Sequence, residues 1–211
     1  MFIFKLPKIL ILTCFVQMIS MVGFAIWPIY LIDLQAQWAL SNSEAGWISG
    51  SFYIGYVIAT PFLVSLTDTF DARKLYAISC IIGSAGLFFF SIFATNAINA
   101  SFFWSLVGVG LAGTYMPGLQ ILNERLDSIK RIKLLPYYTA SFGFGTAFSF
   151  FTIGLIYSFY NWKIAFIIGG LASLFSLFLI LIFVKPIKKN QGKKNLLLRH
   201  PLNFTPVIKN K

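Results

Sequence analysis

A short charged stretch, residues 68–74, separates two long apolar runs and limits what this chain can fold into. It holds Asp68, Asp71, Arg73 and Lys74. One charged side chain at the centre of a bilayer costs about 2.5–3.5 kcal/mol, so these charges must lie outside the hydrocarbon. We therefore interpret the stretch as a water-facing hairpin between two membrane spans.

The overall composition places the whole chain in the same class. Of its 211 residues, 58% are hydrophobic and 11% are charged, whereas soluble domains average about 45–50% and 25%. We therefore expect an all-α integral membrane protein with the lipid bilayer as a partner. A net charge of +11 would suggest a nucleic-acid partner in a soluble protein. Here the basic residues lie at the ends of the apolar runs and in the tail, where they meet anionic lipid headgroups, so we expect no nucleic-acid partner.

Six apolar runs have about the length that spans a bilayer, roughly 20 residues. The first run follows a basic head that contains Lys5 and Lys8. It is too long for a signal peptide and no small-residue cleavage site follows it, so we expect it to be the first span. The prediction is a six-helix transmembrane domain over residues 1–184 and a basic cytoplasmic tail over 185–211. The expected spans are about 9–32, 45–67, 75–95, 102–123, 136–160 and 163–184.

Prolines and small residues predict local detail. Pro28 is expected to loosen the outer turn of the first span. Ser41 or Ser43 is expected to cap the second. Small residues about four apart let two helix backbones approach closely, so close contacts are expected for the second and fifth spans. The residues concerned are Gly46, Gly50, Gly55 and Ala59 in the second span, and Ser141, Gly145 and Ser149 in the fifth.

The distribution of lysine and arginine predicts the orientation of the chain. With six spans, sixteen of the seventeen Lys and Arg residues fall on one side and only Lys163 falls on the other. Basic residues accumulate on the cytoplasmic side of membrane proteins. Both termini are therefore expected in the cytoplasm, which agrees with an even number of spans.

The charged stretch also resembles a known motif. Residues 64–74 (VSLTDTFDARK) are similar to the loop between helices 2 and 3 of the major facilitator superfamily, usually G-x-L-x-D-R-x-G-x-R-R. Asp68, Arg73 and Lys74 match, and the chain departs at the first, sixth and eighth motif positions. In that family the loop aspartate caps a helix end, and the basic residues pair with acids on neighbouring helices and so latch one conformation. The alternative interpretation is a solvated hairpin whose charges only fix the topology.

Later segments resemble the same superfamily in the expected order. The run from Gly108 to Leu119 and the pair at residues 124–125 are similar to bacterial members in which an acid-arginine pair ends helix 4. Residues 138–147 continue the similarity, and residues 162–166 (WKIAF) resemble the W-R-W-x-F pattern that opens helix 6. The resemblance covers nearly the whole chain and implies one six-helix half built as a 3+3 inverted repeat.

The superfamily has two six-helix halves around a central cavity, and this chain resembles the first half only. Its tail resembles the linker between the halves. Three explanations stay open: a truncated or split gene, a half that pairs with a separately encoded second half, or a six-span protein that forms a homodimer. The resemblance implies alternating-access transport of a small-molecule substrate in the cytoplasmic (inner) membrane of a bacterium. The alternative is a half with a structural or assembly role and no independent transport.

By resemblance, the substrate cavity would be lined by the first, fourth and fifth spans, with the second at the interface with the other half. For an aromatic candidate, the alternative role is packing against another helix or anchoring at the membrane interface. An amide at membrane depth needs a hydrogen-bond partner, so Gln17 is either a tie between helices or a substrate contact. The candidates are Gln17, Tyr30, Tyr115, Gln120 and Tyr138, followed by Trp27, Met116 and Thr139.

Charged residues at the cytoplasmic ends of the spans are candidates for a conformational latch. The motif residues Asp68, Arg73 and Lys74 lie on the same side of the membrane as Glu124 and Arg125 in the six-span topology. Opposite charges gathered at one membrane face can pair across helices. We therefore expect these five residues to form one charge cluster.

The spans themselves offer few groups for proton coupling. None of the six runs has Asp, Glu, Arg or His well inside the hydrocarbon, where such residues mark proton relays and ion paths. Coupling would then use Asp33 near the outer mouth, Glu124 at the inner end or a carboxylate in a second half, or would be absent. The alternative role of Asp33 is that of a solvated residue that ends the first span.

The sequence carries no enzyme motif. The only histidine, His200, lies in the tail, and there is no Ser/His/Asp set, phosphate-binding loop or metal-ligand spacing. Cys14 and Cys80 lie inside apolar runs, where packing is a more common role than a disulfide or a metal site. We expect no enzymatic activity, no cofactor and no metal.

Overall fold

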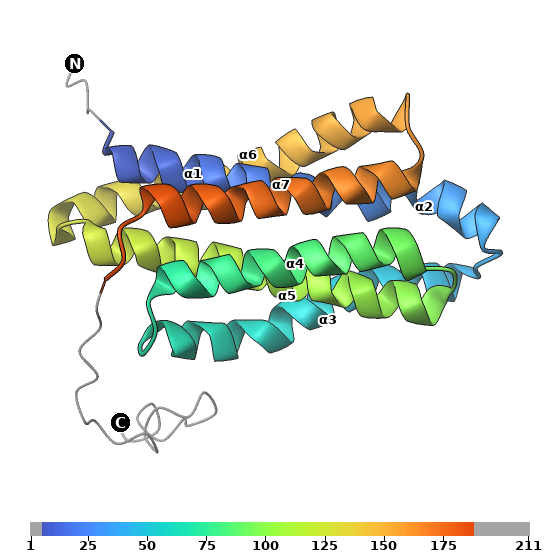
Figure 1. Ribbon diagram of the computed structural model, residues 1–211, viewed down its shortest axis with the longest axis horizontal. Coiled ribbons are helices and arrows are strands. Elements are labelled where there is room, and N and C mark those ends of the chain that lie inside the picture. The colour runs from blue at the N-terminus through green and yellow to red at the C-terminus, as the bar shows by residue number, and fades with distance from the viewer. Residues whose placement is uncertain (1–5, 188–211) are drawn as a thin grey trace.

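The computed structural model describes residues 6–187. Six segments in it are long and apolar enough to cross a membrane, as the sequence predicts. The first span is divided into α1, the short 3₁₀-helix η1 and α2, whereas each later span is one helix (Figure 1). No strand occurs in this part of the chain. The bounds are Lys8–Ser20 for α1, Val22–Ala25 for η1, Ile26–Gln37 for α2, Asn42–Thr67 for α3, Ala72–Phe93 for α4, Ala97–Arg125 for α5, Ser128–Tyr157 for α6 and Trp162–Phe183 for α7.

Polar side chains set the starts of α3 and α5. Ser41 caps α3: its hydroxyl accepts from the Glu44 backbone N–H, and the Glu44 carboxylate accepts from the Ser41 backbone N–H. Asn96 caps α5 by accepting from the backbone N–H of Asn99. This cap starts α5 at Ala97, earlier than the expected residue 102.

The fifth span starts earlier than its apolar run. α6 begins at Ser128, whereas Pro136 was the expected first residue. The expected turn over 124–135 is therefore wrong, because only residues 126 and 127 are not helical. Lys130, on the first turn of α6, pairs with Asp127 at 2.8 Å, and this hydrogen bond lowers the pKa of the Asp127 carboxyl. The apolar run marks only the part of the helix that lies in hydrocarbon, while the helix continues past it.

The first span is interrupted at η1, ahead of the proline that was expected to loosen it. Pro28 lies in the first turn of α2, where its missing N–H costs no helical hydrogen bond. At the interruption, the Ser149 hydroxyl of α6 accepts from the Ala25 backbone N–H at 2.9 Å and donates to the Val22 carbonyl at 2.8 Å. A side chain of another helix thus adds two hydrogen bonds to the backbone at the break.

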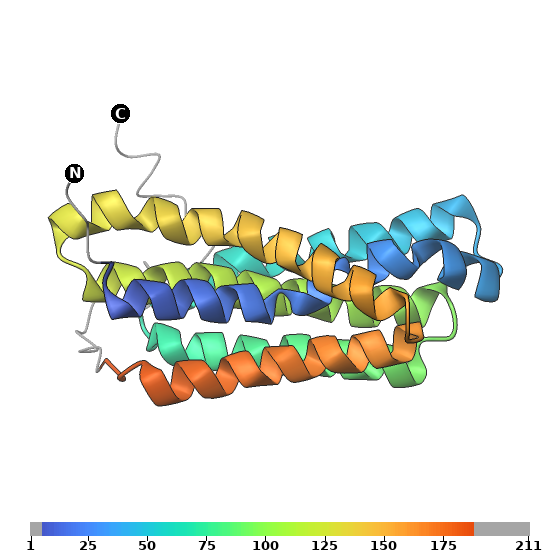
Figure 2. The ribbon, with the colours of Figure 1, turned by 90° about the horizontal axis from the view of Figure 1, so that it is seen from above.

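The six spans pack in a pattern that repeats after three spans. α3 and α4 pack mainly on α5, α6 packs mainly on the first span, and α7 packs on both the first span and α4. Exchanging the first three spans for the last three leaves these contacts unchanged, as in a 3+3 inverted repeat. In Figure 2, α4 and α7 form one outer layer, α1 and α5 lie in the middle, and α3 and α6 lie on the opposite side.

The contact between α3 and α5 depends on two glycines. Gly55 on α3 faces the backbone of α5, and Gly108 on α5 faces the backbone of α3, so closely that neither position has room for a Cβ. A Cβ at Gly46 or Gly50, which belong to the same expected stripe, would meet no neighbouring atom of the described residues within 4 Å. The stripe therefore makes a helix contact at Gly55 and faces open space nearer the start of α3.

An aromatic core holds α4, α5 and α7 together. Phe90 and Phe166 stack with ring centroids 4.0 Å apart. Trp104 and Trp162 pack edge-on against them. All four side chains are buried. Because lipid is as apolar as these side chains, it is their packing that holds the helices together in a membrane.

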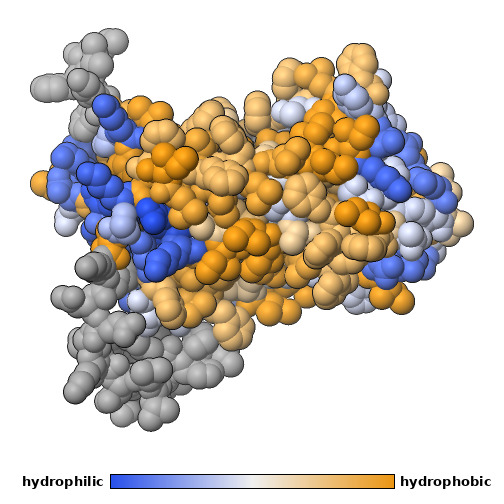
Figure 3. Space-filling view, in the orientation of Figure 1, coloured by the Kyte–Doolittle hydropathy of each residue, from blue (hydrophilic) through white to orange (hydrophobic). Residues whose placement is uncertain are grey.

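The outer surface has the pattern of a protein surrounded by lipid. Figure 3 shows apolar residues over the middle of the bundle and hydrophilic residues gathered at its two ends. Large apolar side chains such as Ile98, Phe151 and Phe178 are exposed on it. A monomeric soluble protein rarely exposes so large an apolar area. The chain is therefore a multi-pass membrane protein.

Candidate functional site

Three of the cavity candidates meet at one place inside the bundle. Gln17 of α1 and Tyr138 of α6 are fully buried, and the Tyr138 hydroxyl donates to Gln17 Oε1 at 3.1 Å. The Tyr115 ring on α5 stacks on the Tyr138 ring, with centroids 5.7 Å apart. Three helices that are distant in sequence thus build one polar group at membrane depth. We call Gln17, Tyr115 and Tyr138 the Gln17 cluster.

A glycine and a free amide shape the Gln17 cluster. A Cβ at Gly118 of α5 would overlap the Tyr138 hydroxyl, so the glycine provides its space. This hydroxyl also lies 3.2 Å from the Tyr115 carbonyl oxygen and 3.4 Å from that of Thr114. Its single hydrogen is therefore shared among three acceptors. The Gln17 Nε2 amide has no hydrogen-bond partner within residues 6–187 and is available as a donor.

The bond between Gln17 and Tyr138 can be tested by a double-mutant cycle. Tyr138→Phe is expected to destabilise the chain by about 1–3 kcal/mol, because the buried Gln17 Oε1 loses its donor. Gln17→Leu in the same chain should recover part of this loss, since removing both partners of a buried hydrogen bond can be nearly neutral. The measurement is the midpoint of thermal unfolding in detergent. Strictly additive losses would contradict the bond.

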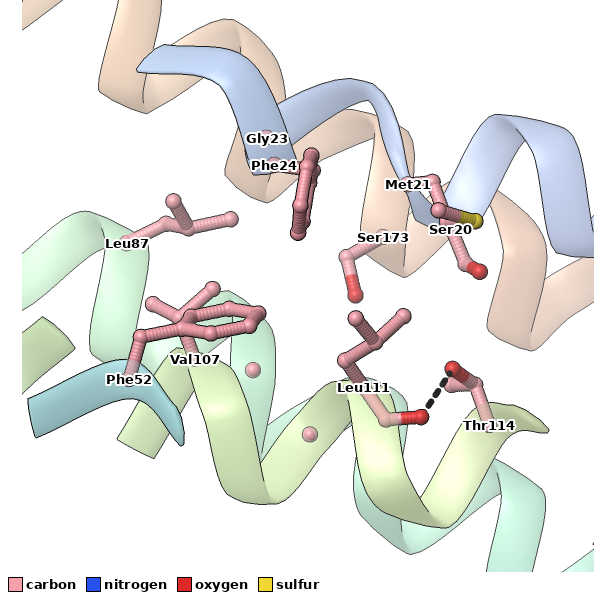
Figure 4. Close-up of a pocket in the computed structure, with 12 residues that line it drawn as sticks. Ser20, Met21, Gly23, Phe24, Phe52, Leu87, Val107, Leu111, Thr114 and Ser173 are labelled. Carbon is pink, nitrogen blue, oxygen red and sulfur yellow. Dashed lines mark hydrogen bonds between the residues drawn. The ribbon is translucent and has the colours of Figure 1, made fainter. Parts of the chain in front are cut away.

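A small cavity lies inside the bundle (Figure 4), lined in part by Ser20 and Thr114, which are close in sequence to members of the Gln17 cluster. The hydroxyl groups of Ser20, Thr114 and Ser173 line it, together with apolar side chains that include Phe24 and Leu87. Its volume is about 20 Å³, enough for one water molecule, which needs about 10–15 Å³. Small-molecule sites measure about 300–1,000 Å³. This cavity is therefore too small for a substrate.

A larger cleft opens between α2, α3 and α6. Its volume is about 190 Å³ and its walls are mainly aromatic. It contains one polar pair, in which the Trp27 indole N–H donates to the Ser49 hydroxyl at 2.8 Å. Of the residues that line this aromatic cleft, only Trp27 was a candidate from the sequence, because apolar side chains in a span give no sign of facing a cleft. The lining residues are Phe24, Trp27, Pro28, Ser49, Phe52, Tyr53, Trp104 and Phe150.

The other candidates of α5 and α6 do not join the Gln17 cluster. Gln120 donates its side-chain amide to Glu124 Oε1 at 3.0 Å, and Asn123 donates to Gln120 Oε1 at 3.3 Å. Met116 is half-buried, and Thr139 is exposed on α6. A row of amides thus leads along α5 from the Gln17 cluster toward the charged end of the bundle.

Tyr30 and Asp33 lie at the opposite end of the bundle. The Tyr30 hydroxyl donates to the Tyr160 carbonyl at 2.8 Å, and its ring packs edge-on against Tyr157. At 1.5 Å per helical residue, Tyr157 lies roughly 28 Å along α6 from Tyr138. Asp33 is exposed and interacts with the Tyr157 phenol. Tyr30 therefore ties α2 to the end of α6, and neither residue approaches the Gln17 cluster.

Two arginines bind the end of α7. Arg73 Nη1 donates to the carbonyl oxygens of Leu181 at 3.3 Å and Val184 at 2.7 Å. Arg125 Nη2 donates to the Lys185 carbonyl at 2.6 Å. The last carbonyl groups of a helix have no helical partner and carry partial negative charge, so cations stabilise this position.

Asp71 completes this arrangement. It is buried, and its carboxylate accepts from the Arg73 backbone N–H at 3.0 Å and from the Ile187 backbone N–H at 3.3 Å. We call Asp71, Arg73 and Arg125 the α7 clamp. The resemblance pointed to Asp68 and treated Asp71 as a departure from the motif. Asp71 is the N-cap residue of α4. An aspartate directly before a helix is a known capping signal, and the motif comparison overlooked it.

The five expected latch residues are therefore divided between two environments. Arg73 and Arg125 belong to the α7 clamp, and Glu124 lies 3.6 Å from Arg125 Nη1. Asp68 and Lys74 are exposed. Within residues 6–187 the Asp68 carboxylate makes neither a hydrogen bond nor an ion pair.

The structure also places the cysteines. Cys14 and Cys80 are free thiols, and Cys80 is fully buried. Within residues 6–187, no three His, Cys, Asp or Glu side chains gather to hold a metal ion. His200 and nearly all of the basic tail expected over 185–211 lie outside the described residues.

The fold and the sequence agree on a family. The model of the Major Facilitator Superfamily matches residues 11–209. The chain belongs to this superfamily. With six spans, it corresponds to the N-terminal half of a major facilitator transporter.

Curated relatives of this facilitator chain are transporters. It is 26% identical over 145 residues to the niacin transporter NiaP of Acinetobacter baylyi, which covers 69% of this chain and 33% of the relative. It is 23% identical over 173 residues to the sphingosine-1-phosphate transporter SPNS2 of Xenopus tropicalis, which covers 78% and 32%. The chain spans about a third of the length of these relatives.

Solved facilitator structures share the fold. A bacterial homologue of the lysosomal transporter Spinster, inward-facing and unoccupied, gives a TM-score of 0.70 at 15% identity over 90% of this chain and 46% of that chain. The proton:xylose symporter XylE gives 0.70 at 16% identity over 82% of this chain and 43% of that chain. The described bundle therefore has the fold of one facilitator half.

Proposed function

We propose that this chain is the first six-helix half of a transporter that moves a small organic solute across the membrane by alternating access. The superfamily match over residues 11–209 carries the proposal. The curated relatives, named as transporters of niacin and of sphingosine 1-phosphate, support a small organic solute. The aromatic cleft, at about 190 Å³, is smaller than a complete small-molecule site, and a second half would supply the remaining wall. Its ring surfaces and single polar pair suit a planar or apolar solute with one polar group.

We propose that a second six-helix half covers the side of the bundle formed by α3 and α6, with a second copy of the chain as the alternative. These two spans are the least buried of the six, at 28% and 22% of their apolar segments. A Cβ at Gly46 or Gly50 on α3, or at Gly143 or Gly154 on α6, would meet no neighbouring atom of the described residues within 4 Å. Exposed glycines allow another helix to approach closely. The aromatic cleft also lies between these two spans, on the path that a solute between two halves would take.

Uptake by proteoliposomes tests the transport proposal. The purified protein, with its second half or as a dimer, is reconstituted and supplied with radiolabelled nicotinate, sphingosine 1-phosphate or xylose. We expect saturable accumulation of an organic solute above that in empty liposomes, with competition by excess unlabelled solute. Equal accumulation with and without protein across the solutes would favour the structural or assembly role instead.

We propose that the residues expected as a latch act across the two halves. The α7 clamp would fix the charged end of this half, and the exposed Asp68, beside Lys74, would reach a partner on the second half. The absence of a contact for the Asp68 carboxylate within residues 6–187 supports a partner outside this range. Glu124 beside Arg125 would add charge to the same interface.

Asp68→Ala is expected to lower uptake at least about tenfold, which corresponds to about 1.4 kcal/mol. The amount of folded protein in the membrane should not change, because the side chain makes no contact within the described half. Asp127→Ala, an exposed acid at the same end, is the matched control and should keep uptake. Normal uptake by Asp68→Ala would contradict the latch.

We propose that both termini lie in the cytoplasm of a bacterial inner membrane, with Asp33 on the outer side as the candidate for coupling. The excess of basic residues at one end of the bundle supports this orientation. An impermeant thiol reagent added to intact cells should label Asn161→Cys and not Asp127→Cys. The reverse labelling would contradict the orientation.

A further inference from the structure

The beginning of α1 and the end of α7 lie at the same end of the bundle (Figure 1). A groove lined by three cations opens there. Its volume is about 640 Å³. Lys8, Arg125 and Lys185 supply the positive charges, and no acidic residue of the described chain lines it. The remaining walls are apolar and come from Ile9, Leu12, Phe183 and Ile187.

Two of the three cations of this groove have no acidic partner within the described chain. Lys8 and Lys185 are exposed, and neither has an ion-pair partner among residues 6–187. The third cation, Arg125, lies 3.6 Å from the Glu124 carboxylate, and Asp71 accepts a backbone N–H that follows α7. The hydrogen bond from Arg125 to the Lys185 carbonyl fixes the position of Lys185 on the groove wall.

The position of the groove limits the chemistry of its occupant. Figure 3 shows that the hydrophilic residues at this end directly adjoin the apolar surface of the bundle. On α1, Lys8 is followed by Ile9 and Leu12, and Phe183 precedes Lys185 at the end of α7. An occupant therefore meets cations on one side and hydrocarbon on the other. A phospholipid with an anionic headgroup matches both parts, whereas a free anion matches only the cations.

We propose that this groove binds the headgroup of an anionic phospholipid. Lys8 and Lys185 contact the headgroup phosphate, and the apolar walls receive the glycerol and the first acyl carbons. Basic clusters at the ends of membrane helices attract anionic headgroups in this way. Because the walls come from both α1 and α7, a bound lipid holds the beginning of the first span against the end of the last. The site is independent of whether the protein transports a solute.

Thermal protection of the purified full chain by defined lipids tests this site. Unfolding is followed in detergent by labelling of the buried Cys80 thiol with a maleimide dye. Phosphatidylglycerol is expected to raise the midpoint of unfolding, and phosphatidylcholine to raise it much less. In Lys8→Gln/Lys185→Gln, the apparent affinity for phosphatidylglycerol is expected to fall about 10- to 30-fold. Lys74→Gln/Lys130→Gln removes two charges from the same end outside the groove and should keep the protection.

Native mass spectrometry gives a second measurement that does not depend on the stability of the variants. Phosphatidylglycerol should stay bound to the wild type and to the control, and should be lost from the groove variant. Equal protection by the two lipids, or an equal loss in both double variants, would overturn the proposal. Full protection by inorganic phosphate or glycerol phosphate would also overturn it, because the site would then bind a free anion.

Discussion

Gly108→Ala is expected to prevent most of the protein molecules from reaching a stable fold. The added methyl group would overlap the backbone carbonyl of Phe52 on α3. A helical carbonyl is unable to turn away as a flexible side chain does, so α3 and α5 would have to separate. Overpacking costs about 1–3 kcal/mol where side chains can adjust, and a rigid neighbour places this change at or above the top of that range. The measurements are the yield of monodisperse protein in size-exclusion chromatography and the midpoint of Cys80 labelling during heating.

Gly46→Ala is the matched control for this substitution. It adds the same methyl group to a helical glycine, but within the described half no neighbouring atom lies within 4 Å of the new atom. Alanine also favours a helix over glycine by about 1 kcal/mol. The yield and midpoint of this variant should equal or exceed those of the wild type. Equal losses in both variants would show that the α3–α5 contact is not as close as described.

Ser149→Ala is expected to be the second most damaging change. It removes the one side chain among the described residues that bonds both the Ala25 N–H and the Val22 carbonyl at the break in the first span. Each buried hydrogen bond lost costs about 0.5–1.5 kcal/mol, so the two together cost about 1–3 kcal/mol, and hydrocarbon offers no water as a substitute. We expect a clear fall in the unfolding midpoint and faster amide hydrogen exchange at residues 22–26.

Thr139→Ala is the control on the same helix. The Thr139 hydroxyl is exposed and donates only to the Leu135 carbonyl of its own helix, at 3.4 Å. This variant should unfold within a degree or two of the wild type, since surface changes of this kind cost about 0.5 kcal/mol or less. If Ser149→Ala unfolded at the same temperature as Thr139→Ala, the Ser149 hydroxyl would not be what stabilises the break in the first span.

The number and order of the spans could be read from the sequence because the thickness of the hydrocarbon core sets the length of each apolar run that crosses it. Helix ends outside the hydrocarbon are set by capping and charge pairs instead. This is why α6 begins at Ser128, whereas the apolar run begins near Pro136. The break in the first span was missed for another reason. Its partner, Ser149, lies 127 residues after Val22, and no local pattern reports such a contact.

The candidate site shows the same division between local and long-range information. Gln17 and Tyr138 could be named one at a time, because a buried polar side chain needs a partner wherever it lies. Their contact with each other depends on how α1 and α6 pack. Asp71 was overlooked because the motif assigned the aspartate role to Asp68. The walls of the aromatic cleft were missed because apolar residues that face lipid, core or cleft look alike in sequence.

The α7 clamp has a consequence for how the protein is made. Arg73 bonds a carbonyl 111 residues further along the chain, so its acceptor does not yet exist when the arginine leaves the ribosome. At about 5–20 residues per second, the interval is roughly 6–22 s. The third to fifth spans are made during that interval, while the α7 acceptors of Arg73 are still missing. Completion of α7 therefore closes the assembly, and a chain that stops just before residue 181 leaves both arginines without the carbonyl groups that they bind in the finished bundle.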